Sequence, residues 1–545
     1  MIRIENAGDY YNVLEINSSS VLNVMKFLNK YGENTNGKYK FHKRYLSLIH
    51  KIDKNITVVK YPWDDIGSDM LLTPYPYQKE VIYHAINNPQ SLLICPTGSG
   101  KTAIMIGIYT EALKRGLTDK PCLIVVKASL KYQWLNECAK FTTLSATVVE
   151  TPSKKKNKFD EQFGNYDIYI ANYETLINED VRNKLKELGI ETMLCDEIQY
   201  ISNHKATRSK AAYEFNDLKI KIGATATPIT NNPENLFGLF NFIKPDLFEK
   251  YSKFSKNYLI YRTFGQVAGV KNQDHLMKTI APYMYVKTEE EIAGQLPELV
   301  VNQIYCEMTP KMKKVNDMIM TDLENERLKS EELEKSIKNP DDIENNEEYL
   351  TSKAKIMAYQ TFAQELVDDP RLLSESDSNM AKNYIVKDKS PKLDILLELV
   401  EQILDEGDKV CIFTNFERMQ KILIEEIESK LKIKCAYVNG SLNAKERYRQ
   451  AYDLFKDDSE YKVLIATSAM EEGISLSECR YLIEYDLAVS YASQIQRHGR
   501  VKRANSVHRT SYIYQLICKD SWDMIATKII EKKEKYDTNL IKALK

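Results

Sequence analysis

The sequence predicts an α/β protein with two parallel-sheet lobes, a helical insertion between them and a small N-terminal α+β appendage. Two long regions repeat the order of short apolar run, turn and amphipathic helix, which is typical of a parallel sheet with crossover helices. The region between them loses that repeat and has helical spacing instead. A length of 545 residues fits several domains of ordinary size, each with its own core.

The N-terminal appendage is predicted over residues 1–70. Apolar and polar residues alternate over 11–16 and 56–59, as in half-buried strands, and residues 21–31 have the spacing of an amphipathic helix. We therefore expect a small α+β domain there, with DNA as a candidate ligand.

The first lobe is predicted over residues 71–249 and the helical insertion over 250–389. Charged residues at 321–350 have the spacing of an exposed helix, which indicates a solvated helical protrusion within the insertion. The strands expected in the first lobe are short apolar runs separated by helical patterns. They lie at residues 91–95, 122–126, 168–171, 193–195 and 220–223.

The second lobe is predicted over residues 390–520, where the strand-and-helix order returns. A C-terminal helix of basic amphipathic character is expected over 521–545. The strands expected in the second lobe are again short apolar runs. They lie at residues 410–413, 435–438, 463–466, 481–485 and 511–516.

Composition and charge exclude several classes of protein. Hydrophobic residues make up 43% of the chain, enough to fill several cores, so a disordered chain is excluded. Lys and Arg number 76 against 77 Asp and Glu, so a polyanionic partner would have to be bound by local basic patches. The nine cysteines form no CxxC pair or Cys/His cluster, which predicts reduced thiols and no zinc site. Without a signal core or a membrane-length apolar run, a cytoplasmic protein of a bacterium or a phage-infected host is expected.

A phosphate-binding loop is predicted between an apolar strand and a helix at residues 94–102. Its glycines let main-chain N–H groups approach phosphates, and the helix N-terminus favours negative charge. Lys101 can reach the β- and γ-phosphates of a nucleotide, and the Thr102 hydroxyl can ligate magnesium. The loop has Cys95 where the usual pattern has glycine. The residues expected to bind the nucleotide in this loop are Pro96, Thr97, Gly98, Ser99, Gly100, Lys101 and Thr102.

Two adjacent carboxylates, Asp196 and Glu197, end a predicted buried strand. Two negative charges in such a place are costly without a metal. Asp196 is therefore expected to hold magnesium, and Glu197 to orient and deprotonate the attacking water. An isolated Asp–Glu pair is more often a surface feature, so this interpretation depends on the loop at Lys101.

Arg500 and Arg503, in the second lobe, are expected one helical turn apart on one face of a helix. Two guanidinium groups there can meet the γ-phosphate of a nucleotide held by the first lobe. Hydrolysis would then require the lobes to close. A basic run of this kind can also be a solvated helix face.

In their order, these motifs resemble those of superfamily II helicases and, more narrowly, of the Swi/Snf-type DNA translocases, over residues 70–520. Segments 74–78, 123–141, 170–174, 196–203, 225–248, 296–309, 439–447 and 469–476 carry the same likeness. The resemblance implies two RecA-like lobes that hydrolyse ATP, with magnesium, in the cleft between them. It also implies that Gln78 reads the adenine and that Gly473 binds the nucleotide. The residues implied to contact nucleic acid or to couple it to the nucleotide are Tyr173, Thr225, Thr227, Asn439 and Gln496.

The sequence departs from the family pattern in two places. Gln199 stands where histidine is commoner, and the residues after Arg503 lack the usual Gly-Gln ending. Residues 496–503 are closer to repair and recombination helicases that anneal or unwind DNA. The appendage at 1–70 is weakly similar to small substrate-binding domains ahead of phage-type and annealing motors.

The resulting hypothesis is an ATP-dependent DNA translocase or helicase that acts on duplex or branched DNA and has no membrane partner. Two basic runs, 154–158 and 205–210, could follow a phosphate backbone or could simply be solvated. The alternatives are an RNA helicase, a catalytically inactive scaffold, and the motor subunit of a restriction, defence or repair complex. Protein partners in replication, recombination, repair or defence are compatible with any of them.

Overall fold

The chain forms two compact units in the computed structural model. The first unit comprises Met1–Ala226, Leu239–Asp246 and Pro282–Gly294, and the second comprises Thr227–Gly238, Leu247–Ala281 and Gln295–Lys545. The structure describes residues 2–7, 10–16, 21–35, 38–42, 49, 51–53, 56–59, 61–152, 157–226, 234–261, 267–292, 296–337, 346–456, 460–470, 474, 476–503 and 506–544.

The N-terminal part is an α+β fold, as the alternating runs predict. One helix, α1 (Val21–Tyr31), covers a five-stranded sheet with the order β3-β4-β2-β1-β5. Ile4, Phe27 and Phe41 lie in its core. The strands are β1 (Ile2–Ala7), β2 (Tyr10–Ile16), β3 (Gly32–Thr35), β4 (Lys38–His42) and β5 (Ile56–Val59).

The first lobe is built on a seven-stranded parallel sheet with the order β14-β6-β11-β10-β7-β9-β8. Its central strands are fully buried, which explains their continuous apolar runs. The strands are β6 (Gln90–Ile94), β7 (Cys122–Val126), β8 (Ala146–Val148), β9 (Ile168–Asn172), β10 (Thr192–Asp196), β11 (Ile220–Thr225) and β14 (Met284–Val286).

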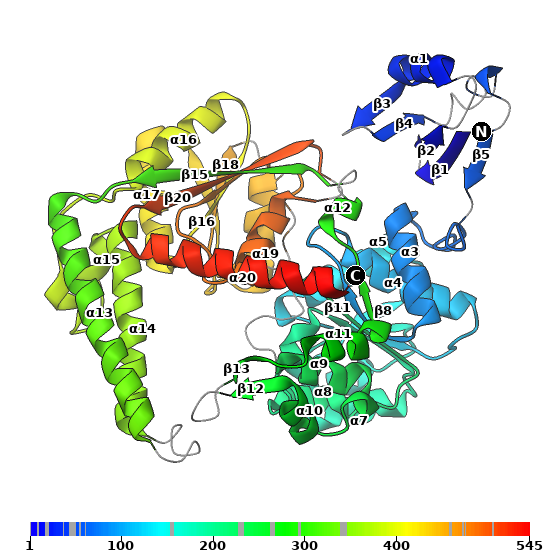
Figure 1. Cartoon of the computed structure of the whole chain (residues 1–545), viewed down its shortest axis with the longest axis horizontal. Helices are drawn as coiled ribbons and strands as arrows, with labels where there is room; N and C mark the ends of the chain where they lie inside the picture. The colour runs from blue at the N-terminus through cyan, green and yellow to red at the C-terminus, as the bar shows by residue number, and fades with distance from the viewer. Residues whose placement is uncertain are drawn as a thin grey trace. The chain divides into compact units, whose positions relative to one another are not determined.

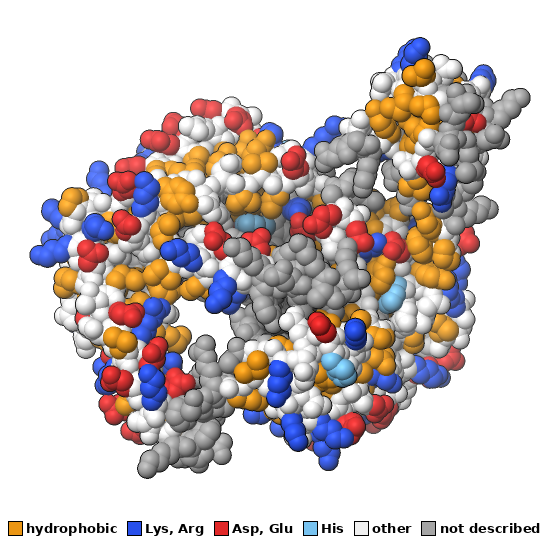
Figure 2. All heavy atoms as spheres, viewed as in Figure 1, with side chains coloured by type: hydrophobic (Ala, Val, Ile, Leu, Met, Phe, Trp, Pro, Cys, Tyr) orange, Lys and Arg blue, Asp and Glu red, His pale blue; other side chains and the backbone are white. Residues whose placement is uncertain are grey.

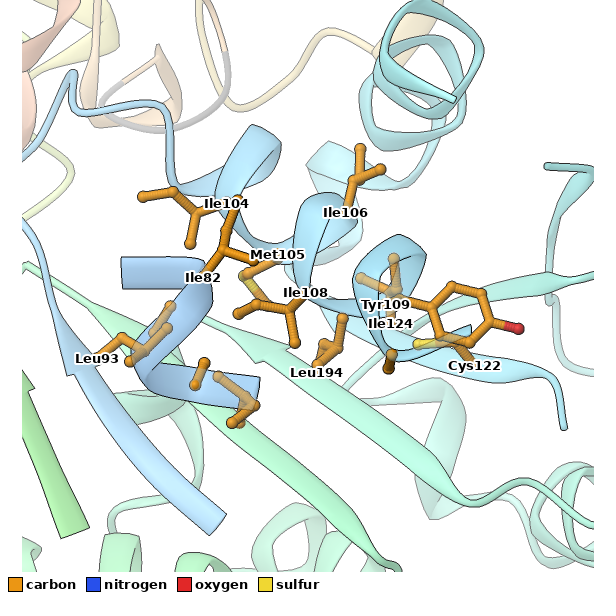
Figure 3. Packing of buried hydrophobic residues seen from close by; sticks show 14 of the residues in the cluster. Ile82, Leu93, Ile104, Met105, Ile106, Ile108, Tyr109, Cys122, Ile124 and Leu194 are labelled. Atoms are coloured by element: carbon orange, nitrogen blue, oxygen red, sulfur yellow. The ribbon is translucent and has the colours of Figure 1, made fainter. Parts of the chain in front are cut away.

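Helices cover this sheet and fix the position of its loops. Helix α4 packs Met105 and Ile108 into one core with Ile82 of α3 and with Leu93 and Leu194 of the sheet (Figure 3). Beyond α1, the described helices of the first unit are α3 (Pro76–Asn87), α4 (Lys101–Lys114), α5 (Lys131–Phe141), α6 (Asn157–Glu161), α7 (Glu179–Glu187), α8 (Thr207–Tyr213) and α12 (Glu289–Ile292). Helix α9 (Asn235–Ile243) is divided between the two units, and α10 (Tyr251–Tyr258) and α11 (Gln273–Ile280) belong to the second.

The second lobe has a six-stranded parallel sheet with the order β15-β20-β19-β16-β18-β17. Two parallel-sheet lobes confirm the predicted fold class. The strands are β15 (Glu298–Cys306), β16 (Val410–Phe413), β17 (Lys434–Val438), β18 (Tyr461–Ala466), β19 (Tyr481–Glu484) and β20 (Thr510–Cys518). The helices are α16 (Leu393–Asp405), α17 (Glu417–Leu431), α18 (Ala444–Tyr448), α19 (Tyr491–Val501) and α20 (Trp522–Leu544), with a π-helical turn at Arg449–Lys456.

The segment at 250–389 is not helical throughout. Two long helices, α13 (Pro310–Ser336) and α14 (Glu347–Asp368), pack along each other as expected of a helical protrusion, and the short α15 (Arg371–Ser374) follows (Figure 1). The same segment also contains the antiparallel pair β12 (Leu259–Tyr261) and β13 (Val267–Val270), and it contributes β14 and β15 to the two lobe sheets. β15 is an edge strand whose residues alternate in exposure, so it lacks the apolar run of a central strand.

The surface has no single basic field on the face seen in Figure 2, where acidic and basic side chains are interspersed. This agrees with the nearly balanced charge of the sequence. On this face, contact with a polyanion would come from small local groups of side chains. Within the described residues, no helix is both long enough and apolar enough to cross a membrane.

Candidate nucleotide site and nucleic-acid surface

The loop between β6 and α4 has the backbone shape of a phosphate-binding loop. Gly98 and Gly100 have φ values of 76° and 73°, in the left-handed region that favours glycine. A Cβ atom at Gly100 would lie 2.5 Å from Nε2 of Gln78, so a side chain there would collide with a neighbouring element. The chain then enters α4 at Lys101, and the N-terminus of that helix faces the loop.

The Lys101 ammonium folds back over the loop that it follows. Its Nζ lies 3.4 Å from the carbonyl oxygen of Cys95 and 3.5 Å from that of Pro96. Both acceptors are neutral and both distances are at the long end for a hydrogen bond. A phosphate oxygen would be a stronger acceptor for this cation than either carbonyl.

Gln78, which the resemblance places on the adenine, contacts the phosphate-binding loop in this structure. The carbonyl oxygen of Ser99 accepts hydrogen bonds from Gln78 Nε2 at 2.9 Å and from the Tyr77 hydroxyl at 2.6 Å. Gln78 Oε1 in turn accepts from the main-chain N–H of Tyr75 at 2.8 Å. Burial raises the pKa of Tyr77 above its ordinary value, so its hydroxyl stays protonated as a donor. Sequence reasoning missed Tyr77, although its position beside Gln78 was a usable signal.

The adjacent carboxylates Asp196 and Glu197 are held by different neighbours. Asp196 ends β10 and is 7% exposed, and its Oδ1 accepts from the N–H of Glu197 at 3.1 Å. Glu197 has a φ of 48°, which turns the chain sharply after the strand. Gln199 Nε2 then donates to Glu197 Oε2 at 2.6 Å. The residue that replaces the commoner histidine therefore orients the expected general base.

Strand register brings these motifs together at the carboxyl ends of the strands in the first-lobe sheet. Asp196 of β10 is level with Ala224 of β11, and Thr225 is level with Ile94, the last residue of β6. The N–H of Cys95 donates to the carbonyl oxygen of Thr225 at 3.1 Å. Thr225 is fully buried, so its contribution is to the support of the loop. Carboxyl ends of parallel strands are where open α/β sheets place their ligands.

Tyr173, the residue directly after β9, supports the same end of the sheet. Its side chain is fully buried, and its hydroxyl donates to the carbonyl oxygen of Asp196 at 2.6 Å. Through this bond Tyr173 positions the end of the strand that carries Asp196. Its ring stacks on Tyr200, with centroids 5.6 Å apart. Tyr200 was missed by sequence reasoning, because nothing in its spacing predicts contact with the residue that follows β9.

Two cations gather at Tyr200, and we name Lys127, Tyr200 and Arg208 the Tyr200 cluster. Lys127 Nζ lies 5.8 Å from the ring centroid, and the Arg208 guanidinium carbon lies 5.4 Å from it. Arg208 NH1 is 3.9 Å from Glu174 Oε1. Its Nε is buried and has no hydrogen-bond partner among the described residues. Arg208 belongs to the basic run at 205–210, whereas residues 154–156 of the other run lie outside the described residues.

In the second lobe, Arg500 and Arg503 do not share a helix, which corrects the expected arrangement. Helix α19 ends at Val501, whose side chain is buried in the core and whose carbonyl oxygen accepts from the Ser511 hydroxyl. Arg503 therefore lies beyond the helix. Arg500 is 7% exposed, and it donates to main-chain carbonyls through Nε and NH1.

Arg497 anchors α19 and was not singled out from the sequence. It is fully buried, and it donates to the carbonyl oxygen of Asp486 at 3.0 Å and to Asn415 Oδ1 at 2.5 Å. Its guanidinium carbon lies 5.2 Å from the centre of the Phe413 ring. The sequence does not separate this arginine from the other basic residues of the run, since its partners come from distant loops.

The remaining expected residues of the second lobe are spread over different structural roles. Asn439 is mostly buried, and it donates to Gln420 and accepts from Ser441, so it holds a turn. Gln496 is half-buried on α19, where its carbonyl accepts from Arg500. Thr227 and Gly473 lie outside the described residues.

Comparisons with known proteins agree with the motif order. The SNF2-related domain matches residues 42–372, and the helicase conserved C-terminal domain matches residues 391–505. YwqA, an ATP-dependent helicase/translocase of Bacillus subtilis, is 22% identical over 509 residues, which are 92% of this chain and 52% of YwqA. YqhH, an ATP-dependent helicase of the same organism, is 25% identical over 85% of this chain and 78% of its own length.

Solved structures in the same comparison include the Sulfolobus solfataricus SWI2/SNF2 ATPase core in complex with dsDNA. It is 23% identical, covers 87% of this chain and 94% of its own, and has a TM-score of 0.40. The chain spans about half the length of YwqA. The SNF2-related domain alone matches more than half of the chain, so the resemblance inferred from the motifs is confirmed. The chain belongs to the SNF2-related family.

Proposed function

We propose that this chain hydrolyses ATP and uses the reaction to move along DNA. The observation that carries the proposal is the arrangement at the carboxyl ends of the strands in the first-lobe sheet. A loop with two glycines in the left-handed region leads into Lys101 at a helix N-terminus. The Asp196–Glu197 pair lies at the end of β10, which is two strands from β6 in the sheet order. This arrangement suits the binding and cleavage of a nucleoside triphosphate.

The side chains present fit both ATP and magnesium. Gly100 leaves room where a Cβ would intrude, and the loop faces a helix N-terminus that favours anions. Thr102 and Asp196 would hold magnesium, which neutralises charge on the phosphates. Lys101 would donate to the β- and γ-phosphates. Glu197, oriented by Gln199, would take a proton from the attacking water.

A shared set of contacts would link nucleic acid to the nucleotide site. The Tyr200 cluster offers two cations, and the Arg208 side chain is 39% exposed, which suits contact with a phosphodiester oxygen. Tyr200 stacks on Tyr173, and Tyr173 is bonded to the main chain of Asp196. A phosphate bound at the cluster would therefore contact a chain of residues that ends at the magnesium-binding carboxylate.

We expect blunt or forked duplex DNA to stimulate ATP turnover more strongly than single-stranded DNA or RNA. Binding should weaken steeply as salt rises and should depend little on sequence, because phosphate contacts release counterions whatever the bases are. Turnover with each nucleic acid at two salt concentrations tests this. Displacement of a triplex strand and of a long complementary strand should accompany it. Stimulation by single strands alone, with efficient unwinding and no triplex displacement, would leave a conventional helicase.

Arg208→Ala is expected to raise the duplex concentration needed for half-maximal stimulation several-fold and to make the salt dependence shallower by about one phosphate contact. Basal turnover should change little, since Arg208 does not touch the nucleotide loop. Lys219→Ala is the matched control. Lys219 is an exposed cation just before β11, at the amino ends of the strands and therefore away from the nucleotide loop. Equal behaviour of the two variants would remove the Tyr200 cluster from the nucleic-acid surface.

A further inference from the structure

The segment Met284–Ile292 is built into the first lobe beside the phosphate-binding loop. β14 pairs with β6 so that Val286 is level with Ile94, and the N–H of Lys287 donates to the carbonyl oxygen of Ile94 at 2.9 Å. Ile94 is the last strand residue before the loop. After Gly294 the chain continues in the second unit. The segment that leads to the second lobe is thus bonded to the strand that delivers the loop.

The same segment is tied to α3, the helix that carries Gln78. Lys287 Nζ lies 2.7 Å from Glu80 Oε2, and the Tyr285 hydroxyl donates to Glu80 Oε1. The side chain of Lys287 is 9% exposed and that of Glu80 is 28% exposed, so solvent screens this pair less than a surface pair. The Tyr285 ring also stacks on His84, one helical turn after Glu80, with centroids 4.2 Å apart.

The Lys287 charge acts on the start of the loop. Burial raises the pKa of the Cys95 thiol to about 11, and the ammonium groups of Lys101 and Lys287 both oppose this rise. Lys101 Nζ lies 3.4 Å from the carbonyl oxygen of Cys95, and the main-chain N–H of Lys287 donates to Ile94, the residue just before Cys95. Glu80 balances Lys287 at short range, whereas Glu291, the second carboxylate near it, is 3.9 Å away.

We propose that Glu80, Lys287 and Tyr285 form a positioning group that transmits the state of the nucleotide site to the segment leading into the second lobe. The proposal rests on the proposed function. Gln78 and the loop are bonded to each other through Ser99, so nucleotide binding at either one would act on both α3 and β6. The segment is bonded to α3 by the ion pair and to β6 by strand pairing, so a change in either element reaches it. None of the three residues needs to touch the nucleotide.

The test compares Glu80→Gln, Lys287→Met, the double variant and Lys287→Arg in the full-length chain. Measured for each are the dissociation constant of a fluorescent ATP analogue, the melting temperature, and ATP turnover with and without duplex DNA. The ratio of stimulated to basal turnover should fall about fivefold or more in Glu80→Gln and Lys287→Met. The double variant should be no worse than the worse single variant, because both remove one interaction. Lys287→Arg should keep the ratio, and the dissociation constant should stay within about twofold.

The matched control is Glu111→Gln, which removes another part-buried ion pair of the first lobe. In that pair, Glu111 Oε1 on α4 lies 2.8 Å from Nε of Arg115, the residue that follows the helix. The ratio of stimulated to basal ATP turnover should stay at the wild-type value in this control. If Lys287→Met lowers stability, or both rates together, and leaves the ratio unchanged, the group is only structural and the proposal fails. If wild-type turnover does not respond to any nucleic acid, the proposed function fails and this proposal fails with it.

Discussion

Replacing Glu197 with glutamine is expected to lower the turnover number for ATP about 100- to 10,000-fold, because an amide cannot accept the proton of the attacking water. The substitution keeps the size of the side chain, and its amide oxygen can still accept from Gln199. Asp196 and the loop at Lys101 are unchanged, so the variant should still bind ATP. Steady-state turnover and the dissociation constant of a nucleotide analogue, measured on the same preparation, separate the two effects.

The control for this substitution is Glu187→Gln, which changes an exposed carboxylate at the end of α7 in the same lobe. It should leave turnover and nucleotide affinity at the wild-type values. Near-normal turnover of a folded Glu197→Gln protein would remove Glu197 from the role of general base. Parallel loss of affinity would instead mean that the carboxylate supports the loop.

The central strands could be predicted because both of their faces are buried. Residues 122–126 and 410–413 form β7 and β16 with the predicted bounds, and each is a continuous apolar run between turns. β14 and β15, both edge strands, were not among the predicted strands. β14 is only three residues long, and β15 is half exposed, so neither has the pattern of a central strand.

That these motifs meet at the carboxyl ends of the strands was also predictable, since the loop at Lys101 and the carboxylates at Asp196 both follow strands of one parallel sheet. The side chains that contact these motifs could not be predicted. Gln78 meets Ser99, and Tyr173 meets Asp196, through contacts between residues more than 20 positions apart. No local pattern encodes such contacts, because they depend on how whole helices and strands pack.

The helix around Arg500 shows the same limit. Its start at Tyr491 follows a capping serine, a local signal, whereas at its end the Val501 carbonyl accepts from the Ser511 hydroxyl of a later strand, a contact that no local pattern predicts. A sequence reading extends the helix to Arg503 because the residues after Val501 include no proline or glycine stop signal. The two arginines consequently have different surroundings, and their substitutions should have different consequences.

Arg503→Ala is expected to lower ATP turnover about 1,000-fold or more, the size of effect that an arginine contributes when it stabilises charge in phosphoryl transfer. Nucleotide affinity and melting temperature should change little, because Arg503 lies beyond the end of α19 and its loss leaves that helix intact. Arg500→Ala should lower turnover too, but it also removes the side-chain donor to the carbonyl oxygen of Ile474 and the additional side-chain donor to that of Gln496. That loss should destabilise the lobe by about 1–3 kcal/mol.

The measurements are turnover at saturating ATP and duplex DNA, the dissociation constant of a nucleotide analogue, and the melting temperature of each variant. Arg509→Ala is the matched control, since Arg509 is an exposed arginine of the same lobe just before β20. A finger that acts only after the lobes close contributes to the transition state and not to initial binding, so the defect belongs in turnover. Weaker ATP binding with an unchanged turnover number in Arg503→Ala would contradict this role, and Arg503 would then be a contact to the bound nucleotide in its ground state.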